Sequence, residues 1–234
     1  MVLPVNEIFG PTISGEGSII GLKTMFVRFA YCDYKCTFCD TKYAVDVNNP
    51  NFSFFNYSED EIVKKLMEMS DCRYVSLTGG NPALFELAEL IRLLKENGYW
   101  VNIETQGSIP KNYFDMADLV TFSPKPPSSG MILDEKKLLE CMGLCKRIVV
   151  KVVLDLEEFD WFMDLYYKIK SCWGDGYGPE FIIQVKNDVG IDTTDTLLEK
   201  LRLLVEKVLS EEDLDNIRIL PQLHVLLWGN KRGV

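Results

Sequence analysis

Short, mainly apolar runs alternate along this chain with longer segments in which apolar residues recur every three or four positions. Runs of the first kind are typical of buried strands, and the second periodicity places apolar side chains on one face of a helix. The strands predicted in this way are Val5–Phe9, Thr24–Phe29, Arg73–Leu77, Trp100–Ile103, Leu119–Phe122, Arg147–Val153, Phe181–Val185 and Ile217–Leu220.

Helices are predicted in the segments between these strands. Ser58 and Glu61 form a capping-box pattern at the start of one helix, and Asn97-Gly98 is suited to end another. The predicted helices cover about 59–70, 84–94, 134–142, 156–170 and 197–208, with a short helix before residue 119.

The regular alternation of strands and helices predicts an α/β fold. The strands read as continuously apolar, as expected for a parallel sheet whose outer face is covered by helices. About six strand–helix units and a final strand are too few to close an eight-fold barrel, so we predict a partial, TIM-like barrel. Residues 44–57 are expected to form an irregular surface loop, residues 174–178 a Gly-rich turn, and residues 1–234 a single domain.

Three cysteines, Cys32, Cys36 and Cys39, lie in the loop that follows the strand ending at Phe29. Short cysteine spacings hold iron–sulfur clusters, and three thiolates on a four-iron cluster leave one iron free for another ligand. The residues alone leave two alternatives open: a structural zinc site completed from elsewhere in the fold, and three reduced thiols. Neighbouring aromatic residues, Phe38 among them, would shield a cluster from water.

The four remaining cysteines are scattered along the chain. Cys141 and Cys145 are four positions apart on a predicted helix and share a face, which could hold a metal. Because free cysteine is among the most buried residue types, we expect Cys72, Cys141, Cys145 and Cys172 all to serve core packing instead.

Polar or glycine residues also follow several other strands. Gly79-Gly80 could let backbone amides approach a bound anion or cofactor, Glu104 and Gln106 end a second strand, and Lys125 lies beyond a third. Each feature alone has a plain interpretation, a tight turn for the glycines and a solvated side chain for the others. Together with the cysteine loop they would meet at one mouth of the sheet, which predicts a cofactor site there.

Composition and charge exclude some classes of partner. A formal net charge of −10 argues against binding to a nucleic-acid backbone. No apolar stretch approaches the length of a membrane span, and the N-terminal residues lack the pattern of a signal peptide. An odd number of cysteines with one tight group suits a reducing compartment, so we expect a cytoplasmic protein without a nucleic-acid or membrane partner.

The motifs in these loops resemble one known family from end to end of the chain. The cysteine spacing, with an aromatic residue before the last cysteine, is that of the radical S-adenosylmethionine (SAM) superfamily. The other motifs narrow the resemblance to the 7-carboxy-7-deazaguanine synthase family, in the form typical of bacilli. These motifs are Glu7-Ile8-Phe9-Gly10-Pro11-Thr12, Gly15-Glu16-Gly17, Cys39-Asp40-Thr41, Thr78-Gly79-Gly80-Asn81-Pro82, Glu104-Thr105-Gln106-Gly107, Ser123-Pro124-Lys125-Pro126 and Pro221-Gln222-Leu223-His224.

The resemblance implies an enzyme that converts 6-carboxy-5,6,7,8-tetrahydropterin to 7-carboxy-7-deazaguanine by radical ring contraction with loss of ammonia. It implies a [4Fe–4S] cluster on Cys32, Cys36 and Cys39, SAM on the open iron, and a Mg²⁺ bound by Thr41. The implied SAM-site residues are Phe38, Cys39, Asp40, Gly80, Glu104, Ser123, Pro124 and Lys125. The implied substrate-site residues are Ile13, Ser14, Gly15, Arg28, Thr78 and Val234.

Two positions depart from the pattern of the resemblance. Asn81 stands where many superfamily members have glutamate, which would replace a charged cofactor contact by an amide one, and Ser14 stands where a glutamine is common. His224, the only histidine, is expected to be structural. The resemblance further implies a flavodoxin or ferredoxin as electron donor, and a homodimer. Two rival classes share the cysteine loop: an activase that abstracts hydrogen from a protein glycine, and a non-catalytic zinc- or cluster-binding module.

Overall fold

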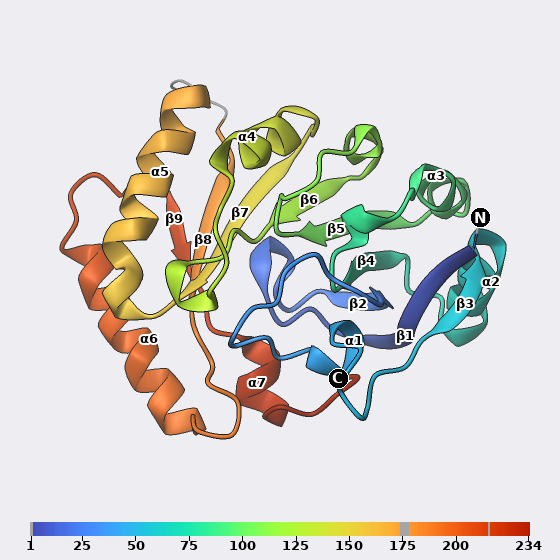
Figure 1. The fold of residues 1–234 in the computed structure, drawn as a ribbon, viewed down its shortest axis with the longest axis horizontal. Coiled ribbons are helices and arrows are strands. Elements are labelled where there is room, and N and C mark those ends of the chain that lie inside the picture. The colour runs from blue at the N-terminus through green and yellow to red at the C-terminus, as the bar shows by residue number, and fades with distance from the viewer. Residues whose placement is uncertain (1, 174–177, 215) are drawn as a thin grey trace.

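The computed structural model describes residues 2–173, 178–214 and 216–234. A twisted sheet runs through the middle of the fold (Figure 1). In this part of the chain the sheet has nine strands, in the order β3-β1-β2-β4-β5-β6-β7-β8-β9. The strands are β1 (Val2–Ile13), β2 (Lys23–Phe29), β3 (Phe55–Ser58), β4 (Tyr74–Gly79), β5 (Trp100–Thr105), β6 (Leu119–Phe122), β7 (Ile148–Leu154), β8 (Glu180–Val185) and β9 (Ile217–Ile219).

Helices lie around the outside of this sheet (Figure 1). The α-helices are α1 (Lys42–Val45), α2 (Glu59–Met69), α3 (Ala88–Glu96), α4 (Glu135–Gly143), α5 (Phe159–Trp173), α6 (Thr194–Leu209) and α7 (Leu223–Trp228). Short 3₁₀ helices are η1 (Gly17–Ile19), η2 (Pro82–Leu84), η3 (Asn112–Met116), η4 (Pro127–Ser129) and η5 (Leu156–Glu158). The predicted capping box at Ser58 and Glu61 is present at the start of α2.

Most of the sheet is parallel. The two strands run parallel in each of the pairs β2–β4, β4–β5, β5–β6, β6–β7, β7–β8 and β8–β9. Only β1 pairs antiparallel, with β2 on one side and β3 on the other. Because β3 and β9 stand at opposite ends of the strand order, the sheet is open, and the predicted α/β partial barrel is confirmed.

The structure differs from the prediction near both ends of the chain. β1 is longer than the predicted Val5–Phe9, and most of β3 and half of α1 lie within residues 44–57, which were predicted to be irregular. An edge strand such as β3 pairs on one side only, so its position depends on β1 rather than on a periodic pattern of its own. The helix α7 was not predicted, and residues 174–177 of the predicted Gly-rich turn lie outside the described residues.

The main hydrophobic core lies between the sheet and its outer helices. Alternate side chains of a strand point to opposite faces, and those on the outer face, such as Leu77, Ile103 and Ile183, are fully buried. Leu90 and Leu94 of α3 belong to the same core. Each such side chain contributes about 1.5–3 kcal/mol through burial, which fixes the register of the strands that carry the loops.

The inner face of the sheet carries an apolar cluster at the amino ends of the strands. Leu119, Val149 and Ile182 form a second, smaller hydrophobic cluster there. The prediction of continuously apolar strands was wrong, because the same face carries buried polar side chains two residues closer to the carboxyl ends of the strands. These are Ser76, Asn102, Thr121, Lys151 and Gln184.

Packing accounts for three of the scattered cysteines but not for the fourth. Cys141 is buried in the main hydrophobic core, and Cys72 and Cys145 are partly buried and pack against that core, as predicted. Cys172 is exposed near the end of α5, so the prediction that it serves packing was wrong.

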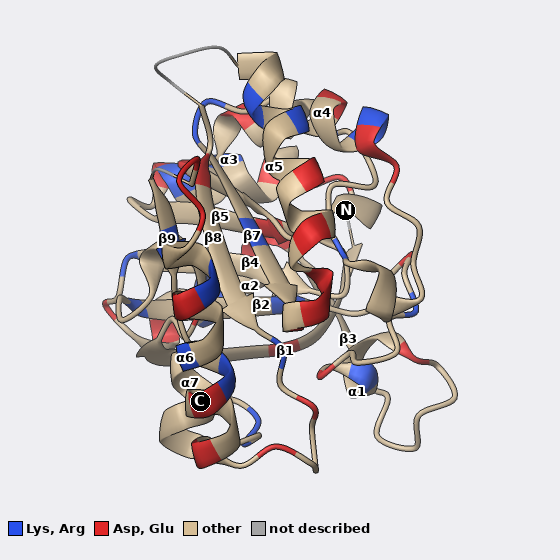
Figure 2. Cartoon of the chain, turned by 90° about the vertical axis from the view of Figure 1, so that its left-hand side faces the viewer, with Lys and Arg blue, Asp and Glu red and all other residues tan. Residues whose placement is uncertain are grey.

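Charges on the outer helices are mixed. On the side drawn in Figure 2, Lys and Arg are interspersed with Asp and Glu over α4 and α6, so this side of the described chain offers no continuous basic strip to phosphates. Within the described ranges, every helix is too short or too polar to cross a membrane.

Candidate functional site

A cavity of about 260 Å³ opens at the carboxyl ends of the parallel strands. Its lining includes Arg28 from β2, Thr78 from β4 and Glu104 from β5, with Ser123 and Lys186 from the segments that follow β6 and β8. Loops at this edge carry the chemistry of α/β folds. The structure therefore has a cavity at the edge of the sheet where the sequence predicted a cofactor site.

The residues predicted to bind cofactor, substrate or metal gather around this cavity. Pro124 is the exception: it is buried and does not line the cavity, whereas its neighbours Ser123 and Lys125 do. Their individual roles stay predictions. The lining contains Ile13, Ser14, Gly15, Arg28, Cys32, Cys36, Phe38, Cys39, Asp40, Thr41, Thr78, Gly80, Glu104, Ser123, Lys125 and Val234.

Three free thiols face the cavity from the loop after β2. Cys32, Cys36 and Cys39 all line it, and none is in a disulfide. Burial raises the pKa of the Cys32 thiol to about 12 and raises that of Cys36 as well. Since the thiolate is the metal ligand, loading of this site releases protons.

The number and kind of donors around the cavity bear on which metal site they could form. Among the described residues, no three His, Cys, Asp or Glu side chains converge closely enough to hold one metal ion. A tetrahedral zinc would draw its sulfur ligands to within about 4 Å of one another. Three free cysteines of one loop line the cavity, a donor set of the kind that holds an iron–sulfur cluster, so the residues present fit a four-iron cluster.

The cysteine loop is tied to the loop after β6. The backbone N–H of Thr37 donates to the Ser129 carbonyl (3.0 Å), and the Thr37 hydroxyl donates to the Ser128 carbonyl (2.7 Å). Ser128 in turn donates through its backbone N–H to Glu158, at 2.7 Å. These bonds hold the segment between Cys36 and Cys39 against a rigid neighbour.

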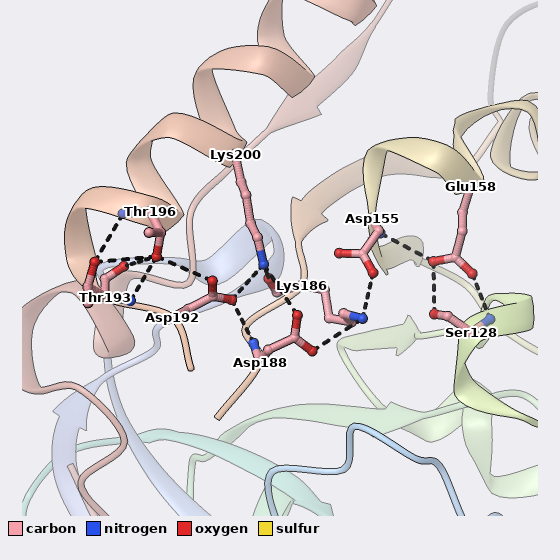
Figure 3. Close-up of polar contacts among 9 residues, drawn as sticks. All are labelled: Ser128, Asp155, Glu158, Lys186, Asp188, Asp192, Thr193, Thr196 and Lys200. Atoms are coloured by element: carbon pink, nitrogen blue, oxygen red, sulfur yellow. Dashed lines mark hydrogen bonds and ion pairs between the residues drawn. The ribbon is translucent and has the colours of Figure 1, made fainter. Parts of the chain in front are cut away.

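Figure 3 shows how this contact extends across the loops after β7 and β8. Lys186 is paired with Asp155 (2.5 Å) and Asp188 (3.2 Å), and Lys200 of α6 is paired with Asp188 (3.4 Å) and Asp192 (2.6 Å). The Lys186 ammonium also lies 5.4 Å from the centre of the Phe38 ring. Three successive strand-end loops thus brace the cysteine loop and one wall of the cavity.

Close backbone packing explains the glycine pair after β4. A side chain at Gly79, whose φ is +122°, would meet the Phe29 backbone at 2.4 Å, and a Cβ at Gly80 would lie 1.7 Å from the Tyr31 carbonyl oxygen. The backbone N–H of Gly80 donates to the Phe29 carbonyl (3.2 Å). The glycines therefore bring β4 against the start of the cysteine loop, and Gly80 also lines the cavity.

We expect Gly80→Ala to lower the free energy of unfolding by about 1–3 kcal/mol, because the new methyl group must push the Tyr31 backbone away. Gly143→Ala is the matched control, since nothing lies within 4 Å of a Cβ built there. Urea unfolding of both variants measures the difference. Equal stabilities would show that the Tyr31 backbone yields without cost.

Arg28 is held at the cavity wall by residues from β1 and α1. Its Nε donates to Glu7 Oε1 (2.8 Å), and the Tyr43 hydroxyl donates to the same oxygen (3.0 Å). Burial alone would lower the pKa of Arg28, but the neighbouring Tyr43 phenol and the carboxylates of Glu7 and Asp40 raise it. Arg28 thus stays cationic and fixed in direction, which suits recognition of a carboxylate.

A largely buried ion pair that sequence reasoning missed lies in the wall of the cavity. Lys151 of β7 pairs with Glu16, and its Nζ lies 3.9 Å from a Glu104 carboxylate oxygen. Gln222 donates a hydrogen bond to Glu16, and the Ser76 hydroxyl donates to Glu104 (2.9 Å). The one signal in the sequence was a lysine inside the otherwise apolar run Ile148–Leu154.

The pair keeps both partners charged. Burial alone would raise the pKa of Glu16, but the charge of Lys151, then that of His224, and hydrogen bonds from Lys151 and Gln222 lower it to about 2. Burial alone would lower the pKa of Lys151, and the charges of Glu16 and Glu104 raise it instead. A fixed carboxylate and a fixed ammonium therefore face the cavity at neutral pH.

The helix α7 closes one side of the cavity. The Leu223 N–H donates to the Gly15 carbonyl (2.9 Å), and a Cβ at Gly15 would lie 2.1 Å from His224 Nδ1. Gly15 is thus required by the position of His224, and His224 itself lines the cavity. Ser14 is 2% exposed, and its hydroxyl donates to the Glu16 carbonyl (3.3 Å).

Comparison with known families agrees with this arrangement. Residues 26–124 match the model of the radical SAM superfamily, and this segment contains the cysteine loop and the strands β4 to β6 beside it. The class that the fold and the cavity define is therefore that of radical SAM proteins, which implies a [4Fe–4S] cluster and SAM as cofactors.

Full-length relatives narrow the class. A protein named 7-carboxy-7-deazaguanine synthase from Bacillus subtilis (strain 168) is 40% identical over 99% of this chain and 98% of its own length. One of the same name from Bacillus cereus is 37% identical over 99% of both chains. The chain belongs to the 7-carboxy-7-deazaguanine synthase family.

Solved structures support the fold alone. The crystal structure of QueE from Escherichia coli has a TM-score of 0.72 and 22% identity over 96% of this chain and 95% of that one. A structure of TYW1 with a lysine-pyruvate adduct bound has a TM-score of 0.51 and 13% identity, covering 80% of this chain and 74% of that chain.

Proposed function

We propose that this protein converts 6-carboxy-5,6,7,8-tetrahydropterin to 7-carboxy-7-deazaguanine with loss of ammonia, in 7-deazapurine biosynthesis. The observation that carries this proposal is one cavity lined both by the cysteine loop and by the loop Ile13–Glu16 with Arg28. Family membership over nearly the whole chain supports the same activity. Residues 1–234 would act as one domain.

In the proposed site, Cys32, Cys36 and Cys39 hold the cluster and Phe38 shields it. When bound, the cluster and SAM supply the one-electron chemistry that removes a hydrogen atom from the substrate. The chain contributes SAM-binding groups on the segments that follow the cysteines and the strands. These groups are Phe38, Cys39, Asp40, Gly80, Glu104, Ser123 and Lys125.

The substrate would lie between Arg28 and the Ile13–Glu16 loop. Arg28 offers a permanently charged donor to the pterin carboxylate, and Glu7 keeps that donor in place. Glu16, ionised by Lys151, offers acceptor oxygens to N–H groups of the ring. Ile13, Ser14, Gly15, Thr78 and Val234 complete this binding wall.

We expect Thr41→Ala to raise the Mg²⁺ concentration needed for half-maximal turnover by at least about tenfold, because the proposed site loses its one protein oxygen ligand. The Thr41 hydroxyl lines the cavity beside Cys39, with 3.5 Å between Oγ1 and Sγ. Iron content should be unchanged. Thr12→Ala, a threonine on β1 that does not line the cavity, is the control. An unaltered Mg²⁺ dependence in Thr41→Ala would remove Thr41 from the site.

The remaining parts of the proposal concern partners. A flavodoxin or ferredoxin would supply the electron, the enzyme would be a cytoplasmic homodimer, and neither nucleic acid nor membrane would be a partner. Analytical ultracentrifugation of the reconstituted protein tests the dimer, with a monomer at micromolar concentration as the contrary result.

Anaerobic turnover tests the activity. Reconstituted protein is incubated with SAM, a reductant, Mg²⁺ and 6-carboxytetrahydropterin, and the products are identified by mass spectrometry. We expect 7-carboxy-7-deazaguanine. Cleavage of SAM without that product would leave the cofactor chemistry intact and exclude the substrate. Metal analysis that gave zinc without acid-labile sulfide would favour the non-catalytic binding module.

A further inference from the structure

Asn81, which replaces a glutamate common in the superfamily, does not face the cavity. It is fully buried and is absent from the cavity lining. Its Nδ2 donates to Asp33 Oδ1 (2.8 Å) and Ser108 Oγ (3.1 Å). Its Oδ1 accepts from the Thr105 hydroxyl (2.8 Å) and the Ala83 N–H (3.1 Å). Because all four positions of the amide are used, its function lies in these bonds.

Gln106, which directly follows β5, joins the same group and reaches a predicted cluster ligand. It is 5% exposed, and its Nε2 donates to Asp33 Oδ1 at 2.5 Å. The same Nε2 lies 3.7 Å from Cys32 Sγ, within hydrogen-bonding range for sulfur. Asp33, Asn81 and Gln106 therefore form a unit, here called the Asp33 brace, that links the segments after β4 and β5 to the first cysteine.

We propose that the Asp33 brace positions Cys32 and that Gln106 raises the reduction potential of the cluster through its N–H···S bond to Cys32. Hydrogen bonds to ligand sulfurs stabilise the more negative, reduced form of an iron–sulfur cluster, and burial strengthens that effect. Asp33 acts in the opposite direction, because its negative charge lies beside the same ligand. Two buried amides that donate to one Asp33 oxygen weaken that opposing effect.

This inference rests on the proposed assignment of Cys32 as a cluster ligand, and it concerns positioning rather than contact with substrate. The brace consists of Asp33, which is next to Cys32, and of two residues from the family motifs. These two are Asn81, in the segment after β4, and Gln106, in the segment after β5. An aspartate at position 81 would place two carboxylates within about 3 Å of each other, which the buried site would not tolerate.

The test is the midpoint potential of the cluster, measured by electron paramagnetic resonance during an anaerobic redox titration of the reconstituted protein. In Gln106→Met, which keeps the length of the side chain but has no donor, we expect the ratio of reduced to oxidised cluster at a fixed potential to fall about tenfold. That change is a shift of about 59 mV to lower potential for a one-electron couple.

Asp33→Asn is expected to shift the potential upward, because it removes the charge and keeps the acceptor oxygen. Opposite shifts in these two variants cannot come from a general loosening of the fold. Gln184→Met is the matched control: Gln184 is a fully buried amide on β8 that donates to the Pro221 carbonyl (2.8 Å), away from the cysteine loop. Its potential should equal that of the unmodified protein.

Unchanged potentials in Gln106→Met and Asp33→Asn, or an equal shift in Gln184→Met, would overturn the inference. If Gln106→Met assembles no cluster, the Asp33→Asn titration decides alone, and no upward shift there contradicts the proposal. Asn81→Asp should lose iron and acid-labile sulfide while retaining its circular dichroism spectrum. Failure of the unmodified protein to hold any cluster would instead refute the proposed function, so the two failures are distinguishable.

Discussion

Lys151→Met is expected to lower the free energy of unfolding by about 3–5 kcal/mol, because it leaves the largely buried carboxylate of Glu16 without its cation. The measurement is urea unfolding of the protein without its cluster, followed by circular dichroism. The double variant Lys151→Met/Glu16→Gln removes both charges together, so it should recover most of the loss. A cost below about 1 kcal/mol for Lys151→Met alone would show that Glu16 is well solvated.

The pH dependence of this difference follows from the pKa of Glu16. That pKa is about 2 in the folded protein, against an ordinary value of 4.5 for a glutamate, so the ion pair stabilises the fold above pH 4.5 and loses its effect as the pH falls toward 2. Lys151→Met should therefore differ most from the unmodified protein near neutral pH and less at pH 3. A difference that grew on acidification would contradict this electrostatic account.

Cys36→Ala is expected to lose the brown absorbance of the four-iron cluster and to reduce formation of 7-carboxy-7-deazaguanine to background. Two remaining thiolates cannot hold three irons of the cluster, and Cys36 lines the cavity between its two partners in the loop. Iron and acid-labile sulfide are measured after anaerobic reconstitution. Cys172→Ala, the same change at an exposed cysteine on α5, should keep the full cluster. A full cluster in Cys36→Ala would end the ligand assignment.

The features that sequence reasoning predicted are those set by local pattern. Apolar runs fixed most strands, a capping box fixed the start of α2, and three cysteines within one loop marked the mouth of the sheet. Each of these depends on residues close together in the chain, or on the rule that the carboxyl ends of parallel strands share one edge. The fold class and the location of the cavity therefore needed no long-range contact to be predicted.

The features that were missed depend on contacts between distant residues. Lys151 and Glu16 are 135 positions apart, and Asn81 and Asp33 are 48 apart. Lys151 was visible as a charge in an apolar strand, but its partner was not, since only the folded sheet brings the Gly15–Gly17 loop over β7. Likewise, Gly15 is explained only once α7 places His224 against it.

Asn81 shows how the structure changes an interpretation of a motif. From the sequence, an amide in place of a glutamate suggested an altered contact with a cofactor. The amide instead makes four hydrogen bonds to the protein, one of them to Asp33 in the cysteine loop. The substitution therefore concerns how the cluster-bearing loop is supported, and Gly80, not Asn81, lines the cavity.

The moles of 7-carboxy-7-deazaguanine formed for each mole of SAM consumed test the central claim most directly. In an anaerobic reaction with 6-carboxytetrahydropterin in excess over SAM, the account predicts many moles of product per mole of SAM. The substrate and the product differ only by ammonia, so the proposed reaction needs no net oxidant and can return SAM at the end of each turnover. An activase that modifies a protein glycine would consume SAM stoichiometrically and form none of this product. That result would contradict the account.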